Sequence, residues 1–370
     1  METLFDNLLM RRTALYLVFL LLGTAVSLFP SVRTAAIPNV DYHTITLQSF
    51  FQLPEGSSVL SSLDSERPEN TNFQWTKGTI YVLGDLHGDY RNTILALQLA
   101  DLIDESLQWK AAEAEHQGGR IALLLGNHEM MNLCGNFAYV YEMEYQKMNV
   151  SFRQYLLGPE GPMGQFLVRL PSLLRVNGIL FVHAGLLPRF AHGKDVHTLN
   201  QQIHLELRGG CAFRNALISQ GKGSQLLSGS EGCLWTRFLM HSSQYNVCKS
   251  LNETLVHLEC EKMIVGHLLQ SDHHIHHRCD GRCLLIDTGN SQYMGGAISV
   301  LEITKDSFFE LTEKKSRGFG RSPEHPTASL PSCVRRWLPI PPLTDRNRDL
   351  WHAFTPHPPC DLPHEERNEL

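Results

Sequence analysis

Short apolar runs recur along the middle of the chain, and each stops abruptly at a polar or glycine-containing segment. The runs are Thr79–Leu83, Ile121–Leu125, Ile179–Val182 and Met263–Val265. Continuous apolar runs of this length are typical of strands that are buried on both faces of a sheet. Between the first two runs, the apolar positions of residues 90–102 repeat at helical spacing. The alternation of strand and helix patterns predicts an α/β domain.

Polar side chains with metal-binding groups follow every one of these predicted strands. They are Asp85 and His87, Asn127 and His128, His183, and His267. In an open α/β sheet, ligands bind at the carboxyl ends of the strands. A mixture of carboxylate, amide and imidazole donors suits Mn, Fe or Zn better than Ca. A single such residue is better explained as a helix cap or a structural histidine, but the joint pattern favours a metal site.

The two ends of the chain carry targeting patterns. Arg11 and Arg12 precede an apolar run that extends from Thr13 to Phe29, and small residues follow it. Residues 1–36 are therefore interpreted as a signal peptide, or as a signal anchor that attaches the N-terminus to a membrane. The final residues Arg367–Leu370 resemble a retrieval signal of the endoplasmic reticulum. Together the two ends predict the secretory pathway, in the lumen of the endoplasmic reticulum.

Composition limits the class of protein. The 370 residues are 42% hydrophobic, which is enough for one substantial core with extensions. The net charge of −6 and the lack of a long basic run argue against a nucleic-acid partner. The 9 cysteines fit an oxidising compartment, but their pairing cannot be read from the sequence.

The chain divides into four parts by composition. Residues 1–36 are the targeting segment, 37–72 a linker, 73–305 the compact domain and 306–370 a proline-rich tail. Within the domain, residues 189–262 have a mostly helical pattern and are predicted to form a cap-like insertion over the site.

The order of the motifs resembles the calcineurin-like metallophosphoesterases of the phosphoprotein phosphatase type, and within them the Shewanella-like protein phosphatases. The resemblance covers roughly residues 75–303. It is carried by Gly84–Tyr90, Leu123–Leu133, Phe181–Pro188, Leu234–Arg237 and Ile286–Gly289. It implies a metallophosphoesterase-type β-sandwich flanked by helices, two divalent metal ions, and a phosphomonoesterase that acts on phosphoproteins.

The same resemblance assigns roles to individual residues. Asp85 and His87 match ligands of the first metal, and Asn127, His183 and His267 match ligands of the second. His128 matches the proton donor to the leaving oxygen, and Glu129 is expected to order its loop. In such centres two cations about 3.5–4 Å apart activate a water and hold the phosphate. Arg237 is the candidate phosphate-binding residue because a guanidinium matches phosphate geometry, although Arg91 and Arg189 are not separable from it here.

The residues after His267 distinguish branches of the family. Diesterase-like relatives continue Gly-His with a second histidine two positions later, but Leu268 and Leu269 follow here. The missing histidine favours the protein-phosphatase branch over nucleases and cyclic-nucleotide diesterases.

One family segment is missing from this chain. The family carries Gly-Asp-x-x-Asp-Arg-Gly at the end of a strand between the first two motifs, and its first Asp bridges both metals. The interval from Asp85 to Asn127 must already hold a helix and the next strand, and a further crossover unit needs about 30 residues. Asp101 and Asp104, at a helix end, are not expected to replace the bridge. We expect a sheet without one internal strand segment, weak occupancy of the second metal site and a large loss of activity.

The sequence is compatible with two functions. The first is a metal-dependent phosphomonoesterase, with its preference for phosphoserine and phosphothreonine or for phosphotyrosine left open. The second is a non-catalytic binding module that keeps the phosphatase shape.

Two further clusters, one of histidines and one of cysteines, are not interpreted as metal sites. His273, His274, His276 and His277 alternate along a strand toward the Asp280-Gly281 turn, which favours a solvated hairpin. Cys279 and Cys283 lack a partner pair at zinc-finger spacing, so thiols or disulfides are preferred.

Overall fold

The computed structural model describes residues 16–21, 71–73, 78–104, 120–138, 150–208, 226–227, 229–313 and 333–348. Most of the predicted targeting segment and linker lies outside these residues, and so does the chain beyond residue 348. No helix of the described residues is long and apolar enough to cross a membrane.

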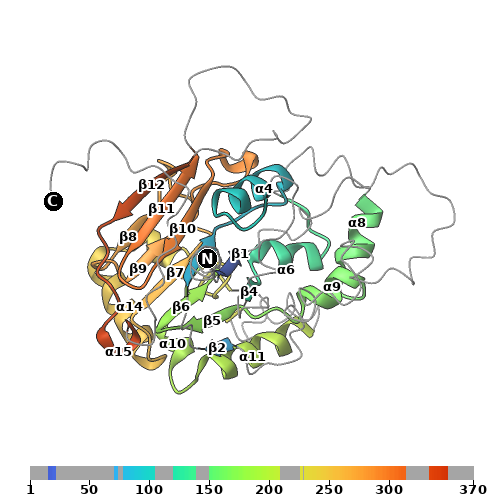
Figure 1. The fold of residues 1–370 in the computed structure, drawn as a ribbon. Helices are drawn as coiled ribbons and strands as arrows, with labels where there is room; N and C mark the ends of the chain where they lie inside the picture. Colours follow the sequence, from blue (N-terminus) through green and yellow to red (C-terminus); the bar gives the residue numbers. More distant parts are fainter. Residues whose placement is uncertain are drawn as a thin grey trace, which may run out of the picture.

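Two six-stranded sheets form the centre of the molecule (Figure 1). Sheet A has the order β12-β11-β10-β3-β1-β4: Cys333–Leu338, Phe308–Glu313, Ser299–Ile303, Thr79–Leu83, Tyr16–Leu21 and Arg120–Leu124. Sheet B has the order β2-β5-β6-β7-β9-β8: Asn72–Phe73, Leu173–Val176, Ile179–Val182, Lys262–Val265, Cys283–Leu285 and His276–Arg278. The four predicted strands correspond to β3, β4, β6 and β7.

Alternating side chains of β3 show why the sheets form a sandwich. Ile80 and Val82 belong to a buried cluster that also contains Phe181 and Ile264 of sheet B. The intervening residues Tyr81 and Leu83 belong to a second cluster, formed with helices. Because neighbouring side chains of a strand point to opposite faces, one face of β3 packs on sheet B and the other packs on helices. The predicted sandwich flanked by helices is confirmed.

Helices cover the outer faces and follow the site-forming strands. They are α4 (Tyr90–Leu99), α6 (Asn127–Leu133), α8 (Val150–Leu157), α9 (Pro162–Leu167), α10 (Pro188–Ala191), α11 (Val196–Arg208), α13 (Phe238–His241), α14 (Gln244–His257) and α15 (Asp345–Arg348). The Asp89 side chain caps α4 by accepting from the N–H of Asn92 at 3.0 Å. The described part of residues 189–262 is mostly helical.

The interior of sheet A holds a strand from the far N-terminus. β1 pairs in parallel with both β3 and β4. Its residues Tyr16–Leu21 lie within the apolar run that was interpreted as a targeting signal. The strand that was predicted to be missing between β3 and β4 is thus replaced in the sheet by β1, which comes from the N-terminal part of the chain.

The predicted boundary between domain and tail at residue 305 is not where sheet A ends. β11 pairs antiparallel with β10, and β12 pairs antiparallel with β11. Both strands come from the segment that was assigned to the proline-rich tail. In Phe308–Glu313, Phe308 and Glu310 are buried and the intervening Phe309 is half-buried, as expected when neighbouring side chains of a strand point to opposite faces. The average composition of the tail, rich in proline and charge, obscured this local pattern.

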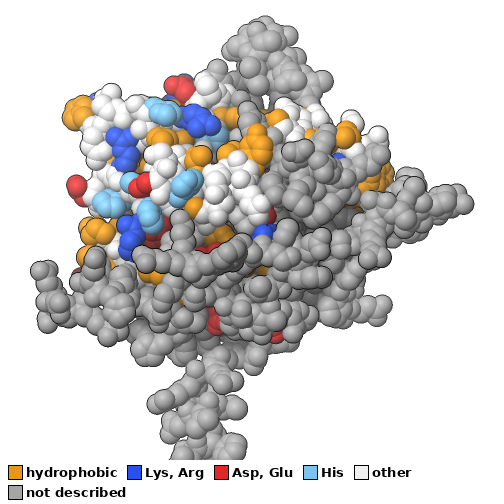
Figure 2. Space-filling view, turned by 90° about the horizontal axis from the view of Figure 1, so that it is seen from above, with side chains coloured by type: hydrophobic (Ala, Val, Ile, Leu, Met, Phe, Trp, Pro, Cys, Tyr) orange, Lys and Arg blue, Asp and Glu red, His pale blue; other side chains and the backbone are white. Residues whose placement is uncertain are grey.

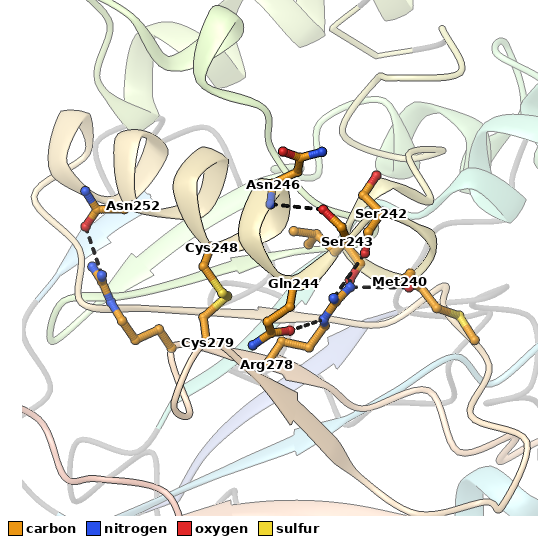
Figure 3. Close-up of a disulfide and its surroundings, with 11 residues drawn as sticks. Met240, Ser242, Ser243, Gln244, Asn246, Cys248, Asn252, Arg278 and Cys279 are labelled. Atoms are coloured by element: carbon orange, nitrogen blue, oxygen red, sulfur yellow. Dashed lines mark hydrogen bonds between the residues drawn. A yellow bond between two sulfur atoms is a disulfide. The ribbon is translucent and has the colours of Figure 1, made fainter.

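A disulfide attaches the β8–β9 hairpin to α14 (Figure 3). It joins Cys248 to Cys279, whose neighbour Arg278 donates hydrogen bonds to the backbone oxygens of Leu239 and Ser242. Cys283 keeps a free, buried thiol. The predicted hairpin is present. Of its two cysteines, Cys279 is disulfide-bonded and Cys283 is a free thiol.

Candidate metal centre

The carboxyl ends of strands from both sheets meet at one place. Gly84 follows β3, and a Cβ atom there would lie 2.7 Å from the backbone oxygen of Ile286, just after β9 of sheet B. Only glycine tolerates such a close approach. The next residue, Asp85, accepts a hydrogen bond through Oδ1 from the backbone N–H of His267 at 3.1 Å. The close contact at Gly84 thus joins a strand end of sheet A to one of sheet B.

The predicted ligands and proton donor are all buried at this junction. Their exposed fractions are 2% for Asp85, 2% for His87, 4% for Asn127, 6% for His128, 0% for His183 and 8% for His267. The rings of His87 and His128 lie 4.3 Å apart, and those of His183 and His267 lie 5.1 Å apart. Side chains from four separate strand ends therefore share one small buried volume.

Donor atoms of three of these residues converge closely enough for one ion. His183 Nδ1 lies 3.7 Å from Asp85 Oδ1, and one donor atom from each of Asp85, His183 and His267 lies within 4.8 Å of the others. Two ligands that are each about 2.1 Å from an ion are at most about 4.2 Å apart, so small side-chain movements suffice. This group combines one residue expected at the first metal with two expected at the second.

The other predicted ligands lie at the edge of this group. His87 Nε2 is 3.8 Å from Asp85 Oδ2. Asn127 Oδ1 is 2.8 Å from His183 Nε2, a distance that suits a hydrogen bond. Roughly the same separation is expected for two donors at adjacent corners of a metal's coordination shell.

Two imidazole nitrogens support the metal interpretation directly. His183 Nδ1 and His267 Nε2 are buried and form no hydrogen bond with any described residue. A buried polar atom without a partner costs free energy, so each such atom calls for an explanation. A divalent ion bound between these nitrogens and Asp85 provides one, and the donor set fits Mn, Fe or Zn.

The backbone at two of the histidines is in an unusual conformation. His87 has φ 47° and His267 has φ 59°. Residues other than glycine rarely adopt positive φ, and such residues cluster at functional sites. Both strained positions are predicted metal ligands.

Burial sets the charge of the site. It lowers the pKa of His183 and, with the charges of His87 and His267, lowers the pKa of His128 to about 3. Burial, followed by the charge of Arg237, lowers the pKa of His267 to about 4. All three imidazoles are thus neutral at pH 7, which is the form that binds metal. Burial, followed by the charge of Asp287, raises the pKa of Asp85, and a nearby cation would reverse that shift.

The structure separates the three arginines that the sequence left equivalent. Arg189 pairs with Glu231 at 2.5 Å, and both side chains are about half exposed. The charge of Arg91 acts on the helix cap Asp89. The charge of Arg237 opposes the rise in pKa of Asp85, so it acts on the donor group itself. Arg237 is therefore the arginine of this set that fits phosphate binding.

The segment that carries Arg237 is fixed to the site. The N–H of Ala184 donates to the backbone oxygen of Cys233 at 2.9 Å, directly after His183. The Trp235 ring meets His267 edge-on at 6.4 Å, and its backbone also forms a hydrogen bond with the His267 side chain. These contacts hold residues 233–237 against two predicted ligands.

Two residues of the centre were not identified from the sequence. Asp287 is 4% exposed, and burial raises its pKa to about 6. It follows β9, so it is another polar residue at a strand end, and that position was the available signal. Trp235 acts through its backbone, which leaves no signature in the sequence. The expected role of Glu129 is present, since its Oε2 accepts from the N–H of Gly126 at 2.9 Å.

No acidic residue follows β1. The strand ends at Leu21, and the next residues in the sequence are Leu22, Gly23 and Thr24. The family's bridging carboxylate has no counterpart at the end of this strand. Asp101 and Asp104, the other acids considered, lie just after α4 rather than at a strand end.

The histidine-rich segment forms surface contacts instead of a second centre. His276 Nε2 binds Asp272 at 2.8 Å, and His274 Nδ1 binds Glu310 at 3.1 Å. Histidine side chains lie among Lys and Arg side chains on the face in Figure 2. Within the described residues, Asp85, His183 and His267 are the one convergent group of three.

Comparison with known proteins agrees with this fold. No family model matches the chain. It is 27% identical over 264 residues to Shewanella-like protein phosphatase 1 of Plasmodium berghei, covering 60% of this chain and 69% of that protein. It is 24% identical over 332 residues to Shewanella-like protein phosphatase 2 of Arabidopsis thaliana, covering 69% and 80%. A cold-active protein-tyrosine phosphatase of a Shewanella species shares the fold, with a TM-score of 0.53 at 18% identity over 65% of this chain and 79% of that one.

The fold is similar to that of a known phosphatase, and the buried donor group is a candidate metal site. The sequence matches support a calcineurin-like phosphoesterase that is related to the Shewanella-like protein phosphatases, and a hydrolase of the metallophosphoesterase type.

Proposed function

We propose that the chain is a metal-dependent phosphomonoesterase for phosphoproteins, with a reduced rate because its bridging carboxylate is missing. The observation that carries the proposal is the buried junction where Asp85, His183 and His267 converge. His87 and Asn127 adjoin it. These residues would hold divalent metal, which when bound polarises phosphate oxygens and lowers the pKa of water. The names of the relatives, which are protein phosphatases, support phosphoproteins as the substrate class.

The chain's own residues would bind and orient the phosphate. Arg237 supplies positive charge to the donor group, since its charge lowers the pKa of Asp85, and its guanidinium suits two phosphate oxygens at once. His128 lies against His87 and is assigned as the proton donor to the leaving oxygen. Its pKa of about 3 keeps the ring neutral at pH 7, so the imidazolium form that would donate the proton is scarce there. The family's second Asp, which orients this histidine, belongs to the missing segment.

A specific observation favours a second function. The strand between β3 and β4 is followed by Leu22, Gly23 and Thr24. Without a carboxylate between them, two nearby cations repel each other with no anion to screen the repulsion. A chain that binds one ion and a phosphate group without hydrolysing it would be a non-catalytic phosphatase-like binding module.

For location we propose the secretory lumen, in the endoplasmic reticulum. The disulfide between Cys248 and Cys279 supports this location, and Cys134 and Cys333 are disulfide-bonded as well. Structural disulfides persist in oxidising compartments. The sequence Arg367–Leu370 at the C-terminus is consistent with retrieval.

The test uses the full chain loaded with manganese. Release of phosphate from phosphoserine, phosphothreonine and phosphotyrosine peptides is measured beside the binding of the same peptides. His128→Asn should abolish hydrolysis while keeping peptide binding, and Arg189→Ala is the matched control that should change neither. Binding without hydrolysis in the wild type would establish the second function. Neither binding nor hydrolysis would overturn both.

A further inference from the structure

The slot between β3 and β4 is an interior position of sheet A. β1 pairs with β3 from Tyr16↔Thr79 to Leu20↔Leu83, and with β4 from Leu17↔Arg120 to Leu21↔Leu124. Its backbone thus has a hydrogen-bonding neighbour along both edges. Without a strand in this slot, sheet A would separate into the group β12-β11-β10-β3 and a lone β4. Each part would expose an unpaired edge in the centre of the domain.

The described residues between β3 and β4, which are 84–104, offer no strand for this slot and contain α4. The filling strand must therefore come from elsewhere, and it must be extended and apolar, because interior parallel strands are covered on both faces. The sequence Tyr-Leu-Val-Phe-Leu-Leu of Tyr16–Leu21 meets this requirement.

We propose that Tyr16–Leu21 is a surrogate strand that is retained in the folded protein. It takes the place that the family fills with the strand before its Gly-Asp-x-x-Asp-Arg-Gly segment. The same residues cannot lie in the sheet and also be removed with a signal peptide or span a membrane, so the proposed lumenal location requires that residues 1–36 stay on the chain after translocation. An intact sheet A therefore requires that the N-terminus is retained, because loss of residues 1–36 leaves β4 without a neighbour and β3 paired with β10 alone.

The register also identifies where an acid would belong. β1 and β4 pair one to one up to Leu21↔Leu124. In the sequence, Gly23 and Thr24 stand two and three residues after Leu21, just as Gly126 and Asn127 stand two and three residues after Leu124. Gly23-Thr24 therefore corresponds in sequence to the Gly-Asp of the missing family segment. If the surrogate strand occupies the slot, Thr24→Asp should supply a carboxylate beside the donor group.

The main experiment follows the backbone and does not depend on metal or activity. The full chain is produced in a cell-free system without translocation, folded under oxidising conditions and analysed by hydrogen exchange with mass spectrometry. Residues 16–21 should be as strongly protected as 79–83. Val18→Pro removes a backbone donor inside the strand, whereas Ala25→Pro changes the same apolar run beyond the strand end. Only Val18→Pro should abolish the protection of 120–124 and lower that of 79–83, which remain paired with β10.

Two results would overturn the proposal. One is equal protection of β3 and β4 in Val18→Pro and Ala25→Pro. The other is a secreted protein that begins near residue 37 and still shows full protection of β3 and β4.

A second variant keeps the proposal testable if Val18→Pro does not fold. Thr24→Asp should raise the manganese bound per chain relative to the matched variant Thr34→Asp, which lies outside the strand. Equal metal content in these two variants, with residues 16–21 unprotected in the wild type, would also contradict the surrogate strand. This arm rests on the proposed metal site. Protection of 16–21 with no bound manganese would therefore reject the metal site and keep the strand.

Discussion

The two sheets contribute differently to the site where their strand ends meet. In sheet B, the neighbouring strands β6, β7 and β9 are followed by His183, His267 and Asp287. In sheet A, β3 and β4 are followed by Asp85 and Asn127, but β1 between them is followed by Leu22-Gly23-Thr24. Sheet B therefore presents a polar donor on every strand at the site, and sheet A lacks one in the middle.

This difference shows that the site is assembled from independent strand ends. Each donor is fixed by its own strand, glycine and loop, as Gly84 and Gly126 illustrate. A substitute strand in the slot can keep the neighbouring donors in place without supplying the missing one. The fold tolerates the replacement, whereas the chemistry loses a ligand.

The largest expected effect concerns the contact between the sheets. Glu310 of β11 is fully buried, accepts from the N–H of Ile275 at 2.9 Å and pairs with Arg336. Glu310→Ala leaves that arginine and the hairpin backbone without their partner. Because Arg336 is 41% exposed, water can screen its unpaired charge, and the main loss is that of the hydrogen bonds from Ile275 and Ser299. We expect the free energy of unfolding to fall by about 2–4 kcal/mol, measured by urea denaturation. Glu253→Ala on the exposed side of α14 is the control, and equal losses in both variants would exclude a special role for Glu310.

The second largest effect is expected when the Asp85 carboxylate, which follows a strand of sheet A and contacts residues of sheet B, is removed. Asp85→Asn keeps the shape but removes the negative charge between His87 and His183. The dissociation constant for manganese should rise by about 100-fold or more, measured by titration calorimetry on the full chain. Asp272→Asn, which changes an exposed carboxylate, should leave it unchanged. Unaltered affinity in Asp85→Asn would place the metal elsewhere.

The charge of the histidines predicts a pH effect in the metal-free protein. The pKa of His267 is lowered to about 4 in the folded state, so the unfolded chain takes up a proton first as the pH falls. The stability from neutral His267 is complete above pH 6.5 and is lost toward pH 4, by about 2 kcal/mol between pH 7 and pH 5. His267→Gln should remove this part of the slope. Asp287, with its pKa raised to about 6, contributes with the opposite sign and loses stability as the pH rises from 4 to 6.

An unchanged slope in His267→Gln, measured by urea denaturation between pH 5 and pH 7, would show that this histidine is not buried in its neutral form.

The smallest effect separates two arginines. Arg237→Ala should raise the dissociation constant for a phosphopeptide about tenfold, because one charge-assisted contact is lost. Arg189→Ala, which breaks only the exposed pair with Glu231, should leave the constant unchanged. Fluorescence anisotropy with a labelled phosphopeptide measures both. A larger loss in Arg189→Ala would reverse the assignment.

The strand ends were predictable from the sequence because their information is local. An apolar run, a glycine and a metal-binding side chain stand next to each other at Asp85, Asn127 and His267. Asp287 also follows an apolar run directly, so its position at a strand end was predictable in the same way.

The origin of β1 was not predictable by the same means. An apolar run such as Thr13–Phe29 satisfies the requirements of a signal sequence and of a strand buried on both faces, so hydrophobicity does not distinguish them. The strands β11 and β12 were not predicted, because residues 306–370 as a whole are rich in proline and charge and neither strand has a regular alternation of buried and exposed positions. Disulfide pairing depends on distances that only the fold defines.

The number of metal ions per chain tests the central claim most directly. The full chain is loaded with manganese, desalted and analysed for metal and protein content. With the donor group of Asp85, His183 and His267 intact and no carboxylate after β1, we predict about one ion per chain. A content of about two would contradict the account, because it would require another ligand to replace the bridging carboxylate that is missing after β1.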